Sequence, residues 1–202
     1  MKSFAVLALT VILAVTLVPA ALAQQPENEQ FHLHLDPAST EVHFTLKDTL
    51  HTVRGSFHLS AGDIVFNART GEAHGLFSVE CGSGASGNDT RDGRMKNELL
   101  EAPKFPLATF EPQKVAGFNP APYAANGARK ISVAGNMTIH GTSRPMTLEF
   151  TVSQSGAATT ATTHFIIPYV DWGIKDPSIP FVKVEKQVAM DVVAKGTLTQ
   201  EK

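Results

Sequence analysis

The chain has 202 residues, a formal net charge of −2 at neutral pH and one cysteine, Cys81. This length suits one domain with a sizeable core, and the weak negative charge argues against a nucleic-acid partner. A single cysteine excludes an intrachain disulfide, so packing must hold the fold together. We expect Cys81 to be a small buried hydrophobic residue rather than a reactive or intermolecular thiol.

Residues 1–23 have the features of a secretory signal peptide. Lys2 gives a positive start, a nearly continuous apolar stretch follows, and a small-x-small cleavage motif ends at Ala23. The alternative is a retained membrane anchor, but polar sequence begins directly after the cleavage motif. We therefore predict cleavage after Ala23, which places a mature chain of net charge −3 in the periplasm or outside the cell. The polar residues 24–30 are predicted to be disordered.

The first half of the mature chain alternates between apolar and polar residues, which is typical of strands with one buried face. Turn residues separate the alternating runs. The expected inward residues are, in chain order, Phe31, Leu33 and Leu35; Val42, Phe44 and Leu46; Val53, Gly55, Phe57 and Leu59; the short run Ile64–Phe66; and Gly75, Phe77 and Val79.

One short helix interrupts this pattern. A glycine-serine loop at residues 82–87 comes before it, and the helix itself is predicted over Arg94–Glu101. Asp92 is the expected N-cap, because a short acidic side chain accepts hydrogen bonds from the first free backbone N–H groups. Pro103 ends the helix.

Strands resume after the helix, beginning with Leu107–Val115 and a loop at 118–127. A long hairpin follows, in which the odd positions of 131–139 and the even positions of 146–152 are apolar or glycine, with a turn over 140–145. The last strands are predicted over Thr162–Tyr169 and over 182–194, where Lys186 breaks the apolar row.

Together these runs give an all-β chain of about eight strands, which closes as an antiparallel barrel or packs as a sandwich. The interior of such a barrel is either filled by side chains or holds one small ligand. Gly55, Gly75 and Gly135 fall in the inward rows, where they mark sharp bends or leave space for a guest.

Four segments of the chain, taken in order, resemble the YceI-like family. The first combines Asp36-Pro37 with Val42-His43-Phe44 and residues 53–57, and the second is Thr90-Arg91-Asp92, with Met95 where the family often has leucine. The third is residues 104–110 and the fourth is residues 135–148. One departure is Ser39-Thr40, where the family often has His-Ser, so any polar role of that histidine is in doubt here.

The resemblance implies a secreted bacterial protein with an eight-stranded, lipocalin-like barrel over residues 31–202. It also implies a long-chain isoprenoid lipid, or a related quinone, as the ligand in the barrel. We expect no cofactor and no catalysis. Transient contact with a membrane and a homodimer are compatible with this picture.

The candidate ligand-binding residues are inward apolar side chains, because aromatic and methionine side chains suit an apolar pocket of loose shape. The alternative is that the same side chains fill a solid core. The candidates are Phe44, Phe57, Phe77, Phe110, Ile139, Met146, Leu148, Phe165, Ile167, Trp172 and Met190.

Arg91 and Asp92 allow two interpretations: Arg91 faces a lipid head group, or the pair holds the loop and caps the helix, which we favour. Trp172 either lines the mouth of the barrel or plugs its end. No metal site is predicted, since His32 and His34 face solvent and lack the spacing of a zinc site even with His43 nearby.

Three functions therefore compete. The first is a non-enzymatic binder of a long apolar lipid, and the second is an interaction protein with a solid barrel. The third is an enzyme acting on a lipid or quinone, which requires polar residues such as His43 or Asp89 inside the barrel. No catalytic motif supports the third.

Overall fold

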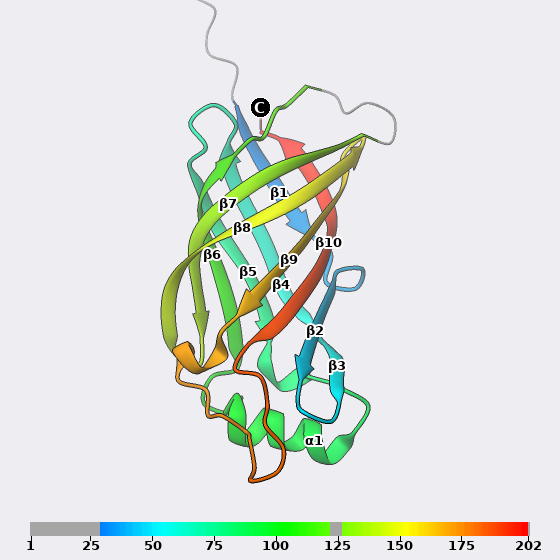
Figure 1. Ribbon diagram of the computed structural model, residues 1–202. Coiled ribbons are helices and arrows are strands. Elements are labelled where there is room, and N and C mark those ends of the chain that lie inside the picture. Colours follow the sequence, from blue (N-terminus) through cyan, green and yellow to red (C-terminus); the bar gives the residue numbers. More distant parts are fainter. Residues whose placement is uncertain (1–28, 122–126, 202) are drawn as a thin grey trace, which may run out of the picture.

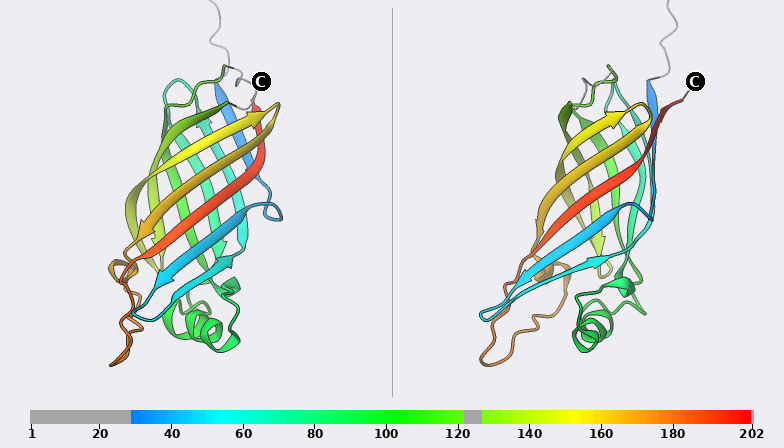
Figure 2. Two further views of the ribbon diagram at one scale, coloured as in Figure 1. Left: turned by 45° about the vertical axis from the view of Figure 1, so that its right-hand side comes forward. Right: turned by 90° about the vertical axis from the view of Figure 1, so that its right-hand side faces the viewer.

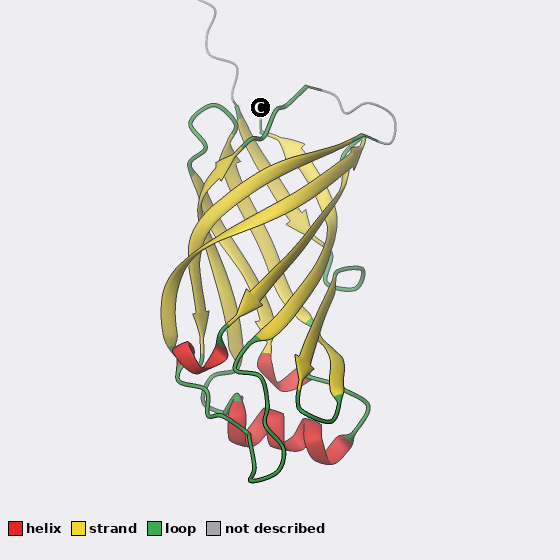
Figure 3. Ribbon diagram, in the orientation of Figure 1, coloured by secondary structure: helices red, strands yellow, loops and turns green. Residues whose placement is uncertain are grey.

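The computed structural model describes residues 29–121 and 127–201. The predicted signal peptide, most of the polar segment after it and part of the loop at 118–127 lie outside these residues. Eight antiparallel strands close into an elongated barrel because the first strand of the sheet pairs with the last (Figures 1 and 3). They are β1 (Gln30–Leu35), β4 (Leu59–Asn67), β5 (Ala73–Glu80), β6 (Leu107–Ala116), β7 (Ala128–Ile139), β8 (Thr142–Ser155), β9 (Ala158–Ile167) and β10 (Val188–Gln200).

Two further strands, β2 (Glu41–Lys47) and β3 (Thr52–Phe57), extend this barrel without adding a ninth position to it. β10 is long enough to pair with β1 along residues 196–200 and with β2 along residues 189–193. β1 and β2 therefore lie one after the other along the same side of β10. The turn at Asp36–Thr40 that separates them is hydrogen-bonded to Lys195. The expected barrel of about eight strands is confirmed.

The hairpin of β2 and β3 leaves the barrel wall at one end of the molecule (Figure 2). β3 does not pair with β5; instead Ser56 exchanges two backbone hydrogen bonds with Ala85 of the loop after β5. The short helices α1 (Asp89–Arg94) and η2 (Met95–Leu99) lie at this end of the molecule. We call this the helix end of the barrel.

Aromatic side chains pack at the opposite end, near which the C-terminus lies. The ring centroids of Phe31 and Phe66 are 5.7 Å apart, and Phe118 meets both rings edge-on at 5.0 and 4.8 Å. Such edge-to-face pairs are favourable beyond the apolar area they bury. We call this the far end.

The alternation predicted for β7 and β8 is confirmed, with Val133, Met137 and Leu148 buried on the inner face. The turn between the strands is shorter than expected. It consists only of His140 and Gly141, at φ of 51° and 73°, and the strand resumes at Thr142. A two-residue turn with both φ angles positive matches the twist of the strands it joins, so the remaining predicted turn residues enter β8.

The predicted helix begins earlier than the sequence pattern indicated. Its N-cap is Asn88, whose side chain accepts a hydrogen bond of 2.9 Å from the Arg91 backbone N–H. Asp92 lies inside the first turn and binds Ser86 instead, so its assignment as the N-cap is wrong. The helix continues as the wide turn η2, which ends at Leu99.

The final strand also differs from the prediction. β10 begins at Val188, and Val182 and Val184 lie in the loop that joins it to the short helix η3 (Tyr169–Trp172). This loop bonds to the β2–β3 turn, with Val184 bridged to Asp48. Within the described residues, no helix has the length and apolar character needed to cross a bilayer.

Candidate ligand-binding cavity

The barrel interior contains two adjoining apolar cavities rather than a solid core. The helix-end chamber has a volume of about 180 Å³ and the far chamber about 110 Å³. Five side chains border both chambers, so the chambers meet at this ring of residues, which we call the waist. The waist residues are Phe77, Phe110, Met137, Phe165 and Val192.

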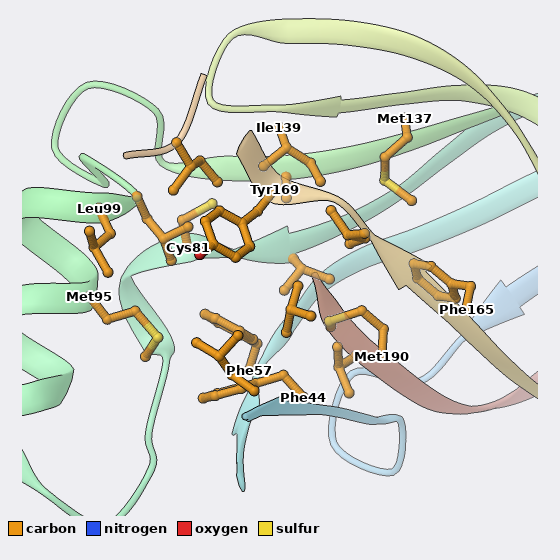
Figure 4. A pocket seen from close by; sticks show the side chains of 18 of the residues that line it. Phe44, Phe57, Cys81, Met95, Leu99, Met137, Ile139, Phe165, Tyr169 and Met190 are labelled. Carbon is orange, nitrogen blue, oxygen red and sulfur yellow. The ribbon is translucent and has the colours of Figure 1, made fainter. Parts of the chain in front are cut away.

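The helix-end chamber is enclosed by strands and by the helical segment together. Figure 4 shows Met95 and Leu99 reaching in from η2 on one side, while Phe44, Phe165 and Met190 point inward from the barrel wall. Met95 and Leu99 lie four residues apart and so share one face of a helical segment. The segment therefore forms part of the cavity wall at the helix end.

The far chamber is lined almost wholly by aliphatic and aromatic side chains from all eight barrel strands and from Phe118. The small side chains of Ala161 and Ala194, which face each other on β9 and β10, leave part of this space open. An apolar cavity of this kind excludes water and accepts apolar guests.

Most of the sequence-predicted candidates border these chambers, and two do not. Met146 packs against the core, and Trp172 is buried, but neither borders a chamber. The bordering candidates are Phe44, Phe57, Phe77, Phe110, Ile139, Leu148, Phe165, Ile167 and Met190.

Trp172 is the last residue of η3 and closes the barrel wall there instead of lining the mouth. Its side chain is 4% exposed, and its indole N–H donates to the Met137 carbonyl oxygen at 3.4 Å. The Arg144 guanidinium lies over the ring at 5.6 Å from its centroid, within range of a cation–π contact. The structure therefore does not place Trp172 among the side chains that line the cavity.

Sequence reasoning missed several residues of the cavity wall. Met95, Leu99 and Leu100 come from the helical segment, and Cys81 from the short helix η1 (Cys81–Ser83). The apolar pair at positions 95 and 99 was a usable signal, because that spacing gives a helix one apolar face. Only the fold shows that this face turns toward the barrel.

The inward glycines leave no free space for a guest. A Cβ atom at Gly135 would collide with the carbonyl oxygen of Glu111 and the ring of Phe110. At Gly55 it would collide with the Phe44 ring and the Ala85 carbonyl oxygen. These glycines therefore permit close approach of neighbouring atoms, and the cavity arises elsewhere.

Two hydroxyl groups stand out in this apolar interior. Tyr169 borders the helix-end chamber and Thr163 the far chamber, and neither buried hydroxyl has a hydrogen-bond partner among the described residues. Burial, and to a lesser extent the charge of Asp176, raises the pKa of Tyr169, so its hydroxyl stays protonated at neutral pH. An unpaired buried hydroxyl is costly, and a ligand with a polar group would relieve that cost.

A polar cleft of about 380 Å³ adjoins the helix-end chamber. Leu99, Lys175 and Pro177 border both spaces, so this cleft is the outer vestibule of the cavity. Its acidic groups have partners: Glu98 lies 3.4 Å from Arg94, Asp176 lies 3.9 Å from Lys186, and Glu101 lies 3.5 Å from His140. Lys175 makes no ion pair within the part of the chain that the structure describes.

Arg91 and Asp92 lie outside both chambers and organise the loop before the helix. The Arg91 guanidinium donates to Ser86 Oγ at 2.7 Å and to the Ser86 carbonyl oxygen at 2.8 Å, while Ser86 donates to the Asp92 carboxylate. Burial alone would raise the pKa of Asp92, but the hydrogen bonds from Ser86 hold it below its usual range. This supports the structural interpretation of the pair.

His32, His34 and His43 lie on the outer face of their strands, as alternation indicated. His32 and His34 both contact Asp63 Oδ1, at 3.1 and 2.9 Å, so an acidic partner that sequence reasoning missed is present. His43 does not join them and contacts Glu41 instead. Among the described residues no group of three or more potential ligands is placed to hold a metal ion.

Cys81 is buried in the cavity wall, which confirms its expected role as a small hydrophobic residue. Burial raises the pKa of its thiol to about 11. The group therefore stays protonated at neutral pH and is a poor nucleophile.

A family model of the YceI-like domain matches residues 33–195, which is most of the chain and nearly all of the barrel. The chain belongs to the YceI-like family. The match begins in β1 and ends in β10, so it includes both chambers and the helical segment at the helix end. The resemblance found in the sequence is thereby confirmed, and no curated protein matches this YceI-like chain.

Solved structures share the barrel at low sequence identity. BcnA of Burkholderia cenocepacia aligns with a TM-score of 0.65 at 23% identity, covering 81% of this chain and 99% of BcnA. A polyisoprenoid-binding domain from Saccharophagus degradans, implicated in plant cell wall breakdown, aligns with a TM-score of 0.65 at 17% identity, covering 83% and 98%. The YceI protein of Campylobacter jejuni aligns at 0.56 and 18% identity, covering 76% and 88%. At these identities the likeness establishes the fold.

Proposed function

We propose that this YceI-like protein is an exported, non-enzymatic binding protein that holds a polyisoprenoid or similar long apolar lipid, a quinone included, inside the barrel. The observation that carries the proposal is the pair of apolar chambers joined end to end at the waist. Membership of the YceI-like family, and the polyisoprenoid-binding domain among the proteins of similar fold, support the choice of ligand class.

The energetics suit reversible loading. Moving one five-carbon unit from water into the chambers is worth roughly 4 kcal/mol, at about 0.8 kcal/mol per carbon. Several units would exceed the practical ceiling of about −20 kcal/mol for noncovalent affinity if water were the donor. A membrane is already apolar, so exchange between membrane and barrel is close to balanced. A carrier or reservoir needs that balance.

The polar end of the lipid belongs at the helix end in this proposal. There the chamber opens into the polar cleft, Lys175 lies at the junction, and the Tyr169 hydroxyl has no hydrogen-bond partner among the described residues. The tail then extends past the waist toward the aromatic cluster at the far end. Because Phe77, Phe110, Phe165 and Met137 surround the waist, a long tail requires these side chains to shift.

The two alternatives find less support. An interaction protein with a solid barrel does not account for the two chambers. An enzyme acting on the lipid requires converging polar side chains inside the barrel, but His43 and Asp89 are both exposed. The polar atoms that do border the interior, such as Thr163 and Tyr169, are isolated hydroxyls at different depths.

The direct test is the lipid content of the protein. The chain is expressed with its own N-terminal segment in a bacterial host, purified without detergent, and extracted with organic solvent for mass spectrometry. We expect a long-chain isoprenoid lipid or quinone in a fixed ratio to protein, because the dry chambers select apolar guests over water. An extract holding only the phospholipid background of an unrelated exported protein, purified in parallel, would refute the proposal.

Export has its own measurement in the same sample. The intact mass of the purified protein is expected to correspond to a chain that begins at Gln24, because the small residues at Ala21 and Ala23 suit signal-peptide cleavage. Retention of residues 1–23 on the purified chain would contradict this part of the proposal and favour an anchored protein.

A further inference from the structure

Three large apolar side chains project into solvent at the helix end. Phe181 is 93% exposed, Leu50 is 65% exposed and Ile179 is 54% exposed. We call Leu50, Ile179 and Phe181 the apolar tip. Single exposed apolar residues are common on protein surfaces, but three on adjoining loops form a distinct feature.

The two loops that carry the apolar tip are fastened together. Thr49 N–H donates to the Lys183 carbonyl oxygen at 3.0 Å, and Glu185 N–H donates to the Lys47 carbonyl oxygen at 2.9 Å. Ile179 and Val182 exchange backbone hydrogen bonds of 3.0 and 3.1 Å, which presents Phe181 on a closed turn. Figure 2 shows both loops side by side, projecting beyond the barrel. The exposed side chains are therefore held in place together.

The apolar tip also lies beside the opening of the cavity. Ile179 borders the polar cleft, and residues of the same loop, Ile174, Lys175 and Pro177, border the helix-end chamber. A surface touched by the tip therefore faces the vestibule through which a lipid would pass.

We propose that the apolar tip inserts into the surface of a lipid bilayer and docks the helix end of the barrel against it. The inference rests on the proposed function, because that bilayer is then the donor or acceptor of the bound lipid. The loop that carries Ile179 and Phe181 has three lysines, Lys175, Lys183 and Lys186, against Asp176 and Glu185, whereas the whole chain is net negative. Lys47, the last residue of β2, adds a fourth lysine beside Asp48. An exposed apolar point among lysines is the pattern of interfacial membrane contacts.

A protein partner fits this surface less well. Stable protein interfaces bury about 800 Å² on each side and require complementary shape. Three side chains on two projecting loops offer little area. A bilayer requires only that apolar groups reach past the head groups, and the geometry of Phe181 provides this.

Vesicle binding tests the proposal. The purified protein is sedimented with vesicles of phosphatidylethanolamine and phosphatidylglycerol, and Phe181→Ser is compared with Ile166→Ser, which removes a side chain of 41% exposure from the wall of β9. We expect Phe181→Ser to bind roughly tenfold more weakly, since burying a phenylalanine is worth about a tenfold change or more. Ile166→Ser is expected to bind like the parent protein.

A second variant reports insertion directly. Trp172 is the only tryptophan and is buried, so Phe181→Trp adds one exposed fluorophore. We expect its emission to shift to shorter wavelength with vesicles and to be quenched by brominated lipids.

Vesicle binding that is absent in the parent, or unchanged by Phe181→Ser, would overturn the proposal. So would a parent dimer that Phe181→Ser dissociates while vesicle binding stays the same, which would assign the tip to a second copy. Lipid content is measured without vesicles, so failure here is separable from failure of the proposed function.

Discussion

Replacing Ala161 with phenylalanine is expected to remove long-tailed lipid from the purified protein. Ala161 is 7% exposed, lies on β9 and faces the far chamber beside Ala194. A phenyl group there would occupy space that the tail needs. Displacing one five-carbon unit costs roughly 4 kcal/mol relative to water, so we expect at least a tenfold loss of long-chain lipid per protein. Mass spectrometry of the organic extract measures it.

The matched control is Ala158→Phe, on the same strand but facing solvent. It is expected to retain the parent's lipid content. Filling a core position can itself cost about 1–3 kcal/mol, so circular dichroism and thermal unfolding must show that Ala161→Phe is folded. Ala194→Phe, on the facing strand, probes the same space if it is not. Equal lipid content in folded Ala161→Phe, Ala194→Phe and Ala158→Phe would show that the far chamber holds no ligand.

A phenylalanine introduced at the other end of the cavity is expected to have a different effect. Ala108 lies on β6 and borders the helix-end chamber, which every tail must cross in the proposed orientation. Ala108→Phe should therefore reduce lipids of all lengths, whereas Ala161→Phe should spare short tails. The opposite pattern would place the polar head of the ligand at the far end.

Replacing Trp172 with alanine is expected to give the largest loss of stability. The side chain is almost wholly buried, donates to the Met137 carbonyl oxygen and lies under Arg144. Truncating a buried tryptophan costs about 3–5 kcal/mol, from lost apolar burial and from the cavity that remains. Chemical unfolding followed by far-ultraviolet circular dichroism measures the change, since the variant has no tryptophan left to report by fluorescence.

Phe181→Ala is the control, because it truncates an aromatic side chain that is already in solvent. It should change the free energy of unfolding by about 0.5 kcal/mol or less. All three proteins are compared after extraction of bound lipid, since a ligand that binds only the folded state adds to apparent stability. If Trp172→Ala costs no more than Phe181→Ala, Trp172 does not close the barrel wall.

The inner face of each strand was predictable because side chains in a strand alternate between its two sides. The rows of β7 and β8 therefore fell on the expected face, and nine of the eleven candidates border a chamber. Trp172 borders neither chamber, because it lies in a short helix after β9, where the two-residue alternation of a strand no longer applies. The N-cap was also predicted wrongly: Asn88 caps the helix, whereas Asp92 accepts hydrogen bonds from Ser86 across the loop.

The sequence by itself determined that this is an all-β chain without a disulfide, which strand residues face inward, and which family it resembles. The tertiary structure alone decided that the inward side chains leave two chambers, that Met95 and Leu99 help to enclose them, and that Leu50 and Phe181 project together. The physical reason is that alternation is a local property of a strand, whereas open space depends on side chains meeting across the barrel. Those side chains come from strands far apart in the chain, and only closure of β1 against β10 sets their distance.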